Sequence, residues 1–282
     1  MTIFQSTEKD VQISRQIALI AAFTAIVFLS TSLFYIPLIS STGFFNLGEA
    51  FIYLAAIIGG PIVGAIAGGL GAAMADMVLG YGYFAPATLV LKGLEGFAVG
   101  FLFRKSRNID RNIRYILLGT ISLFLIGFSA YVTTPALNGV EGSSIIQITF
   151  RLLDPSLIPQ HLLDPTIEDV YQTLVIDIPG ILILATALLI CLIMWFIELR
   201  MGEKGQMILS CLLAGPIIVV GYFLYEIFIL TLSPDPAVAF QLAVTEVPFN
   251  IAQVVFGTSI AIPIVSYLQE LGILQDERVP PS

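Results

Sequence analysis

The fold is decided by residues 45–96, which read FNLGEAFIYLAAIIGGPIVGAIAGGLGAAMADMVLGYGYFAPATLVLKGLEG. Three apolar runs fill this stretch, and turn signals at residues 59–61 and 80–86 separate them. Apolar runs of this kind are typical of membrane helices, and Pro61 stands at a favourable first helical position. The stretch predicts helices over residues 47–58, 61–79 and 86–103.

The remainder of the chain has the same apolar character. Of its 282 residues, 57% are hydrophobic and 11% are charged, whereas a soluble domain has about a quarter charged residues. Further apolar runs predict helices over residues 14–35, 113–132, 178–198, 205–230 and 247–267. Residues 1–15 are polar and the run after them is long enough to span, so no cleavable signal peptide is evident. We expect an all-α polytopic membrane protein of about eight spans.

The basic residues indicate the orientation of the chain in the membrane. With the N-terminus inside, ten of the twelve Lys and Arg residues lie on the cytoplasmic side. Arg151 alone lies outside, and Lys92 lies within a span. We therefore expect a cell-membrane protein with both termini in the cytoplasm. The loop over residues 134–175, which repeats the tetrapeptide LLDP, would lie outside as a lid or cap.

Polar side chains inside the spans are the main functional signal, because an ionisable group in a membrane is costly. They come early in spans that enter from outside and late in spans that exit, so they share the outer half of the bilayer. Glu246, Asn250 and Gln253 form one stripe on a helix, and Lys92 and Glu95 are close enough to pair. Interhelical hydrogen bonds would explain single residues, but the shared depth favours a pocket open to the exterior. The candidate ligand contacts are Asn46, Glu49, Asp76, Tyr83, Lys92, Glu95, Tyr222, Glu226, Asn250 and Gln253.

Two loops that mix aromatic residues with glycines flank these residues, at 42–48 and 80–86. Their rings could stack on a flat heterocycle, or they could form the aromatic belt of a membrane interface. Acidic residues outnumber Lys92 in this region, which favours a neutral or cationic ligand, or acids that are protonated.

Other classes of chemistry find little support in the sequence. Cys191 and Cys211 lie in apolar runs as packing residues. His161 is the only histidine and lies in a polar loop, which excludes a His-based zinc site or a Ser-His-Asp triad inside the membrane. The glycines of residues 59–71 are not followed by Lys-Ser or Lys-Thr, so they form no nucleotide-binding loop. We expect no catalytic residue, metal, cofactor or nucleic-acid partner.

Small residues mark two helix surfaces. Gly60, Gly64 and Gly68 recur every four residues and predict the close approach of a neighbouring helix. A second set lies at the same spacing on two adjacent faces of the first helix, and would pack either within the bundle or against a partner subunit. It comprises Ala18, Ala21, Ala22 and Ala25.

Residues 45–96, with GYFLYE at 221–226 and PFNIAQ at 248–253, resemble the substrate-binding (S) components of energy-coupling factor (ECF) transporters. The resemblance is closest to the riboflavin-type group and covers residues 14–105 and 205–270. It implies a six-helix bundle that captures a vitamin from outside and docks on a membrane coupling subunit driven by two ATPases. It also implies that the alanine face meets this subunit, with Ala21 and Ala25 as the best match.

The chain departs from the family pattern between residues 105 and 203. We therefore expect four S-component-like helices over residues 1–105, an insertion with two spans and the acidic loop over 106–204, and the last two helices with a cytoplasmic tail over 205–282.

The leading hypothesis is a substrate-binding subunit for ATP-driven uptake, which is not an enzyme. The alternatives are a stand-alone proton-coupled carrier that uses Asp76, Glu95 or Glu226, an intramembrane enzyme, and a scaffold whose polar residues are only structural. Riboflavin, thiamine precursors and other small heterocycles all remain open as the ligand.

Overall fold

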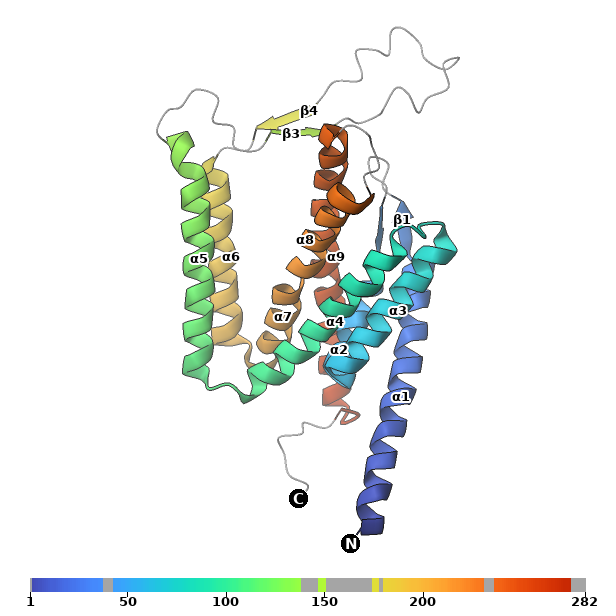
Figure 1. Ribbon diagram of the computed structural model, residues 1–282. Helices are drawn as coiled ribbons and strands as arrows, with labels where there is room; N and C mark the ends of the chain where they lie inside the picture. Colours follow the sequence, from blue (N-terminus) through green and yellow to red (C-terminus); the bar gives the residue numbers. More distant parts are fainter. Residues whose placement is uncertain are drawn as a thin grey trace. The chain divides into compact units, whose positions relative to one another are not determined.

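The computed structural model describes residues 2–37, 43–137, 147–150, 174–177, 180–230 and 236–274 (Figure 1). The chain divides into two compact units. The first comprises Met1–Leu38, Gly43–Asn108 and Arg200–Ser282, and the second is built around Ile109–Leu199. The domain boundaries predicted from sequence, after residues 105 and 204, stay a prediction.

The first unit is a helical bundle. Its helices are α1 (Thr2–Leu33), α2 (Gly48–Gly59), α3 (Pro61–Leu79), α4 (Ala85–Asn108), α7 (Gly202–Ala214), α8 (Pro216–Tyr225), a short π-helix η4 (Glu226–Leu230) and α9 (Pro236–Glu270). The short α2 packs against α1, α3, α4 and α9, so it lies at the centre of the unit. Apart from Glu49 in its first turn, it is largely apolar on all sides, as is typical of a helix surrounded by others, and Ile52, Tyr53 and Ala56 are fully buried.

Glycines bring α3 and α4 into close contact, as the four-residue spacing predicted. A Cβ atom added to Gly64 would lie 2.6 Å from the carbonyl oxygen of Gly96, and one added to Gly69 would lie 2.5 Å from the carbonyl oxygen of Leu89. A Cβ atom on Gly100 would meet the backbone of Pro61. The facing glycines of α4 are therefore as necessary to the contact as those of α3.

Among the described residues, five helices are long and apolar enough to cross a membrane, and α2 is apolar but shorter. The five spans are residues 10–33, 61–79, 85–108, 202–228 and 246–270. In the second unit, α5 (Arg111–Leu137) and α6 (Gly180–Arg200) occupy the positions of the two additional spans that the sequence predicted. The all-α polytopic membrane fold is thus confirmed.

Side-chain contacts pair α5 with α6 in the second unit. The guanidinium of Arg114 donates a hydrogen bond of 2.8 Å to the carboxylate of Glu198. The rings of Tyr115 and Trp195 lie 5.7 Å apart. These two contacts join the start of α5 to the end of α6, and nearer the middle the Cys191 thiol lies 3.8 Å from the carbonyl of Ser122, as expected for two antiparallel helices.

Several predicted helix boundaries were wrong. Helix α1 begins at Thr2 instead of residue 14, and α9 begins at Pro236 instead of residue 247, so that Glu246 lies inside the helix. The single helix predicted over 205–230 is divided at Pro216, which has no backbone N–H to donate, and it ends in the π-helix. Where a helix continues beyond its apolar run or ends in polar residues, the hydropathy pattern gave no signal for the additional helical residues.

Two short antiparallel strand pairs were not predicted. Strand β1 (Tyr35–Pro37) pairs with β2 (Phe44–Asn46), and β3 (Gln147–Phe150) pairs with β4 (Leu174–Asp177). The β1–β2 pair connects the end of α1 to the start of α2. The rest of the loop interpreted as a lid lies outside the described residues.

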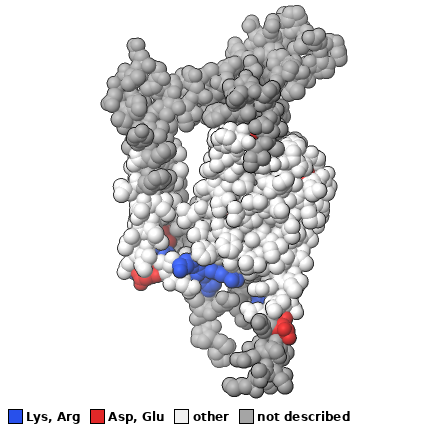
Figure 2. Space-filling model, viewed as in Figure 1, with Lys and Arg blue, Asp and Glu red and all other residues white. Residues whose placement is uncertain are grey.

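The two ends of the bundle differ in charge. Arg104 donates a hydrogen bond of 3.2 Å to the carbonyl of Gly59, and Lys204 lies 3.7 Å from Glu270. Arg107 near the end of α4 lies 3.6 Å from Glu203 at the start of α7, so the ends of α2, α4 and α9 and the start of α7 share one end of the unit. Lys and Arg gather in a band there (Figure 2). The start of α2, the end of α3 and the start of α4 lie at the opposite end.

We expect Gly96→Leu to destabilise the bundle, because a side chain at this position would collide with the backbone of Gly64. Overpacking of a close contact typically costs about 1–3 kcal/mol. The melting temperature of the purified protein in detergent should therefore fall. Gly82→Ala is the matched control, since a Cβ atom there would meet nothing within 4 Å. Equal melting temperatures for the two variants would contradict the role assigned to the glycine contact.

Candidate ligand-binding site

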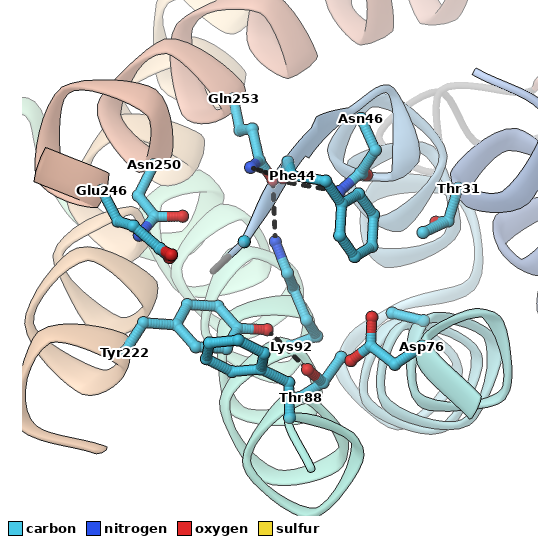
Figure 3. A pocket seen from close by; sticks show the side chains of 13 residues that line it. Thr31, Phe44, Asn46, Asp76, Thr88, Lys92, Tyr222, Glu246, Asn250 and Gln253 are labelled. Carbon is cyan, nitrogen blue, oxygen red and sulfur yellow. Dashed lines mark hydrogen bonds between the residues drawn. The ribbon is translucent and has the colours of Figure 1, made fainter. Parts of the chain in front are cut away.

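A cavity of about 40 Å³ opens in the first unit at the end away from the basic band. It collects side chains from α1, β2, α3, α4, α8 and α9, and Figure 3 shows them converging from these helices. The lining residues are Thr31, Gly43, Phe44, Asn46, Ala72, Asp76, Phe84, Thr88, Lys92, Tyr222, Glu246, Asn250 and Gln253.

Lys92 extends from α4 into the middle of this site (Figure 3). It is 4% exposed, and its ammonium forms an ion pair with Glu49 on α2, which is 1% exposed. The ammonium also donates a hydrogen bond of 3.3 Å to the Oε1 atom of Gln253 and lies 5.7 Å from the centre of the Tyr222 ring. A buried charge needs such partners, because removing it from water costs several kcal/mol.

The ion pair of Lys92 was not predicted. Glu95 on the same helix, which the sequence placed close enough to pair, interacts electrostatically with Lys92, and its carboxylate accepts a hydrogen bond of 2.7 Å from the hydroxyl of Tyr53. The ion-pair partner of Lys92 comes from α2 instead. Spacing along one helix cannot detect a partner on another.

Two amide side chains attach β2 to α9 at the edge of the site. Asn46 donates to the Oε1 atom of Gln253 over 3.4 Å, and the Nε2 atom of Gln253 donates to the carbonyl of Phe44 over 3.2 Å. The Oδ1 atom of Asn46 accepts from the backbone of Gly48 over 2.8 Å. This network holds the short strand and its Phe44 ring against the cavity.

Asp76 and Thr88 form the opposite side of the site. The hydroxyl of Tyr222 donates to Thr88 over 2.9 Å, and the Thr88 hydroxyl also interacts with the carboxylate of Asp76. Asp76 is 4% exposed, and its Oδ2 atom is buried without a hydrogen-bond partner. It therefore offers an unused acceptor to whatever occupies the cavity.

Aromatic rings cover the outer side of the cavity. The Phe44 ring lies 4.7 Å from Tyr81 and 6.0 Å from Tyr35, and Phe84 lies 6.1 Å from Tyr222. Partial burial raises the pKa of Tyr81, and the nearby Tyr35, Glu246 and Asp76 raise it further. The Tyr81 hydroxyl therefore keeps its proton at neutral pH and can act as a donor. The two loops that mix aromatic residues with glycines thus place aromatic rings at the cavity, as the first of the two interpretations of these loops predicted.

The structure brings six of the predicted residues together at the cavity: Asn46, Asp76, Lys92, Tyr222, Asn250 and Gln253. Glu49 lies behind Lys92, Glu95 lies deeper beside Tyr53, Glu226 is buried in η4, and Tyr83 is 42% exposed. Those four do not line the cavity.

The site residues that the list of candidates omitted are Thr31, Gly43, Phe44, Ala72, Phe84, Thr88 and Glu246. Signals for some of them were present, because Glu246 belongs to the α9 stripe and the two Phe residues belong to the aromatic loops. A lone threonine or alanine in an apolar helix carries no such signal. Within the described residues no cluster of His, Cys, Asp and Glu could hold a metal ion.

Comparison with known proteins gives the family. A sequence model described as ECF-type riboflavin transporter, S component, matches residues 12–153, which is half of the chain. The chain belongs to this family. A protein of Pyrococcus woesei described as uncharacterized is 42% identical over 107 residues, which cover 38% of this chain and 69% of that protein. No solved structure matches the chain.

The family match changes the extent of the resemblance. The matched region continues past residue 105, where the sequence pattern predicted the start of an insertion, and it includes α5. It ends before α7, so the resemblance noted at residues 221–226 and 248–253 lies outside the matched region. As an S component, the protein is a membrane-embedded component of a transporter and has a role in substrate binding or transport.

We expect Lys92→Met to destabilise the protein strongly, because it leaves the Glu49 carboxylate buried without a positive partner. Breaking a buried pair in this way costs about 3–5 kcal/mol. The double variant Lys92→Met/Glu49→Gln should melt at a higher temperature than Lys92→Met alone. Lys204→Met is the control, since Lys204 and Glu270 are an exposed pair. A double variant that melts below both single variants would contradict a direct pair.

Proposed function

We propose that this S component captures a vitamin or a related small heterocycle from outside the cell and passes it on for ATP-driven uptake. The observation that supports this function is the polar and aromatic cavity at one end of the bundle, opposite the basic band. Basic residues favour the cytoplasmic side, so the cavity would face the exterior and both termini would face the cytoplasm. A site for a small molecule typically combines a lining of aromatic and apolar side chains with a small number of polar groups.

Ligand entry requires a movement of the cavity wall. The cavity of about 40 Å³ holds little more than a water molecule, whereas pockets for small molecules usually have about 300–1,000 Å³. Phe44 belongs to a strand of three residues, and Tyr81 to the turn between α3 and α4. These short segments can move without repacking the helices. We propose that they open to admit the ligand and close over it.

Coupling to ATP hydrolysis would use the outer face of α1. Ala18, Ala21, Ala22 and Ala25 are all exposed on the first unit. The other face of the same helix packs inward through Leu19, Ile20 and Phe23, which contact buried residues of the bundle. An exposed stripe of small residues lets another membrane helix approach closely. We propose that the membrane coupling subunit of an ECF module, with its two ATPases, docks here.

A second candidate function is a stand-alone proton-coupled carrier. Buried acids near the cavity favour it. Glu95 is fully buried and its Oε2 atom lacks a hydrogen-bond partner, and Glu226 is 2% exposed and interacts with the carboxyl group of Glu246. Such acids inside a membrane are typical proton sites. The two functions differ in their energy source, which an uptake experiment separates.

We expect native mass spectrometry of the protein purified from its own host membrane to show a bound vitamin-sized molecule. Asn250→Ala removes a polar group of the cavity wall and should weaken binding of that molecule roughly tenfold, the value of one hydrogen bond of about 1.4 kcal/mol. Ser259→Ala is the control, because Ser259 is exposed on the same helix and its hydroxyl donates to the backbone carbonyl of Val255. A protein that stays empty after incubation with a panel of vitamins would refute the proposed function.

We expect Ala21→Trp and Ala25→Trp to abolish ATP-driven uptake in cells while the purified variants keep their ligand affinity. A bulky side chain on this face would block docking without touching the cavity. Ile62→Trp, at an exposed position of α3, should leave uptake unchanged. Uptake that survives deletion of the ATPases and stops when a protonophore is added would favour the carrier over the S component.

A further inference from the structure

Two buried polar atoms at the cavity have no hydrogen-bond partner among the described residues. They are the Oγ1 atom of Thr31 on α1 and the Oδ2 atom of Asp76 on α3. Thr31 is 2% exposed and Asp76 is 4% exposed, and both line the cavity. A buried polar group without a partner is unfavourable, so two of them at one cavity point to a ligand that supplies the missing hydrogen bonds.

The hydroxyl of Thr31 differs from other helical hydroxyls of this protein. A hydroxyl inside a helix commonly donates to a backbone carbonyl one turn earlier, and those of Thr120, Ser210 and Thr258 do so here. Thr31 makes no such bond within the described structure. Its hydroxyl lies against the start of α2, because a Cβ atom added to Gly48 would collide with it. The Thr31 hydroxyl therefore keeps its proton for a group in the cavity.

A chain of hydroxyl groups defines the role of Asp76. The hydroxyl of Tyr222 donates to the Thr88 oxygen over 2.9 Å. The proton of Thr88 is therefore left for its hydrogen bond with the Asp76 carboxylate. One oxygen of Asp76 is thus used as an acceptor, and Oδ2 is a second acceptor without a donor. The ligand group that meets Oδ2 must be an N–H or an O–H.

Thr31 and Asp76 lie at the same part of the cavity. Helices α1 and α3 approach closely about one turn earlier, where a Cβ atom added to Gly71 would lie 2.8 Å from the Val27 side chain. Thr31 follows Val27, and Asp76 follows Gly71, by little more than one helical turn. Figure 3 shows Thr31 and Asp76 on the same side of the site, across from Asn250. One ligand group can therefore meet both side chains.

The two side chains together suit the edge of a ring. Asp76 accepts from a donor, and the Thr31 hydroxyl can donate to an acceptor beside it. A ring N–H next to a ring carbonyl, which is a lactam edge, presents this donor and acceptor side by side. Phe44 and Phe84 line the same cavity, and flat rings pack well on aromatic rings. The cavity therefore fits a ring better than a hydroxylated chain.

We propose that Thr31 and Asp76 form a specificity subsite that binds the lactam edge of a flat heterocycle. The N–H of this edge donates to Oδ2 of Asp76, and the carbonyl accepts from the hydroxyl of Thr31. The inference rests on the proposed function as a binding subunit and deepens it. A carboxylate or phosphate group of a ligand has no donor for Asp76 and would not bind at this subsite.

Two probes that differ in one donor test the subsite by titration of the full chain in detergent. Riboflavin carries a lactam edge, and N3-methylriboflavin has the same ring without the N–H. We expect riboflavin to bind at least roughly tenfold tighter, the value of a hydrogen bond to a charged group. Asp76→Ala should abolish this preference, because the N–H then has no acceptor to lose. The preference is a ratio measured on one sample, so partial unfolding of the variant does not alter it.

Thr31→Val separates a ligand contact from a structural role. The empty variant should melt no lower than the parent, because the hydroxyl that is removed has no partner in the described structure. Its affinity for riboflavin should fall roughly threefold to tenfold, the value of a neutral hydrogen bond. Thr258→Val is the matched control, since Thr258 is also buried in the bundle but does not line the cavity. It should bind riboflavin like the parent.

Lumiflavin, which has the lactam edge but no hydroxylated chain, should depend on Thr31 and Asp76 as riboflavin does. A dependence that only riboflavin shows would place its chain at this subsite and overturn the lactam edge. Equal binding of riboflavin and N3-methylriboflavin, or a preference that survives Asp76→Ala, would overturn it too. So would a folded protein that binds neither riboflavin nor lumiflavin. Binding of thiamine, which has no lactam edge, would then leave the binding subunit intact, whereas no binding of any probe would count against both proposals.

Discussion

A lysine buried inside the bundle imposes the main constraint on this protein. The ammonium of Lys92 cannot stay in a membrane without a negative partner, and the partner, Glu49, stands on another helix. The central helix α2 must therefore lie next to α4. Close packing makes this possible, because a Cβ atom on Gly96 of α4 would lie 3.1 Å from the Ile52 side chain of α2. The glycine contact and the ion pair thus join the same two helices.

The same ion pair determines what the cavity can offer to a ligand. Lys92 uses Glu49, Gln253 and the Tyr222 ring, so little of its charge remains available. Gln253 in turn bonds to Asn46 and to the backbone of β2. The Oδ2 atom of Asp76 on α3 has no hydrogen-bond partner and belongs to the cavity wall. The partners that satisfy the buried charge of Lys92 therefore leave this carboxylate oxygen to a ligand.

The sequence predicted which residues lie at the same depth better than it predicted which residues touch. Positions along apolar runs placed Asp76, Lys92 and Asn250 near one end of the bundle, because each residue advances a helix by a fixed rise. They did not identify Glu49 as the partner of Lys92, since that choice depends on how helices are arranged around one another. They also missed Thr31, which lines the cavity, and Thr88, whose hydroxyl matters only once Asp76 and Tyr222 stand beside it.

The family description does not by itself decide the ligand. The matched region, residues 12–153, contains Asn46, Asp76 and Lys92, but Tyr222, Glu246, Asn250 and Gln253 lie beyond it. One wall of the cavity is therefore built by helices that the match does not cover, and that wall supplies Glu246. Without Glu246 the lining would hold one acid and one base. The helices outside the family match thus supply four of the residues that line the cavity, Tyr222, Glu246, Asn250 and Gln253, so the family match alone does not define the site.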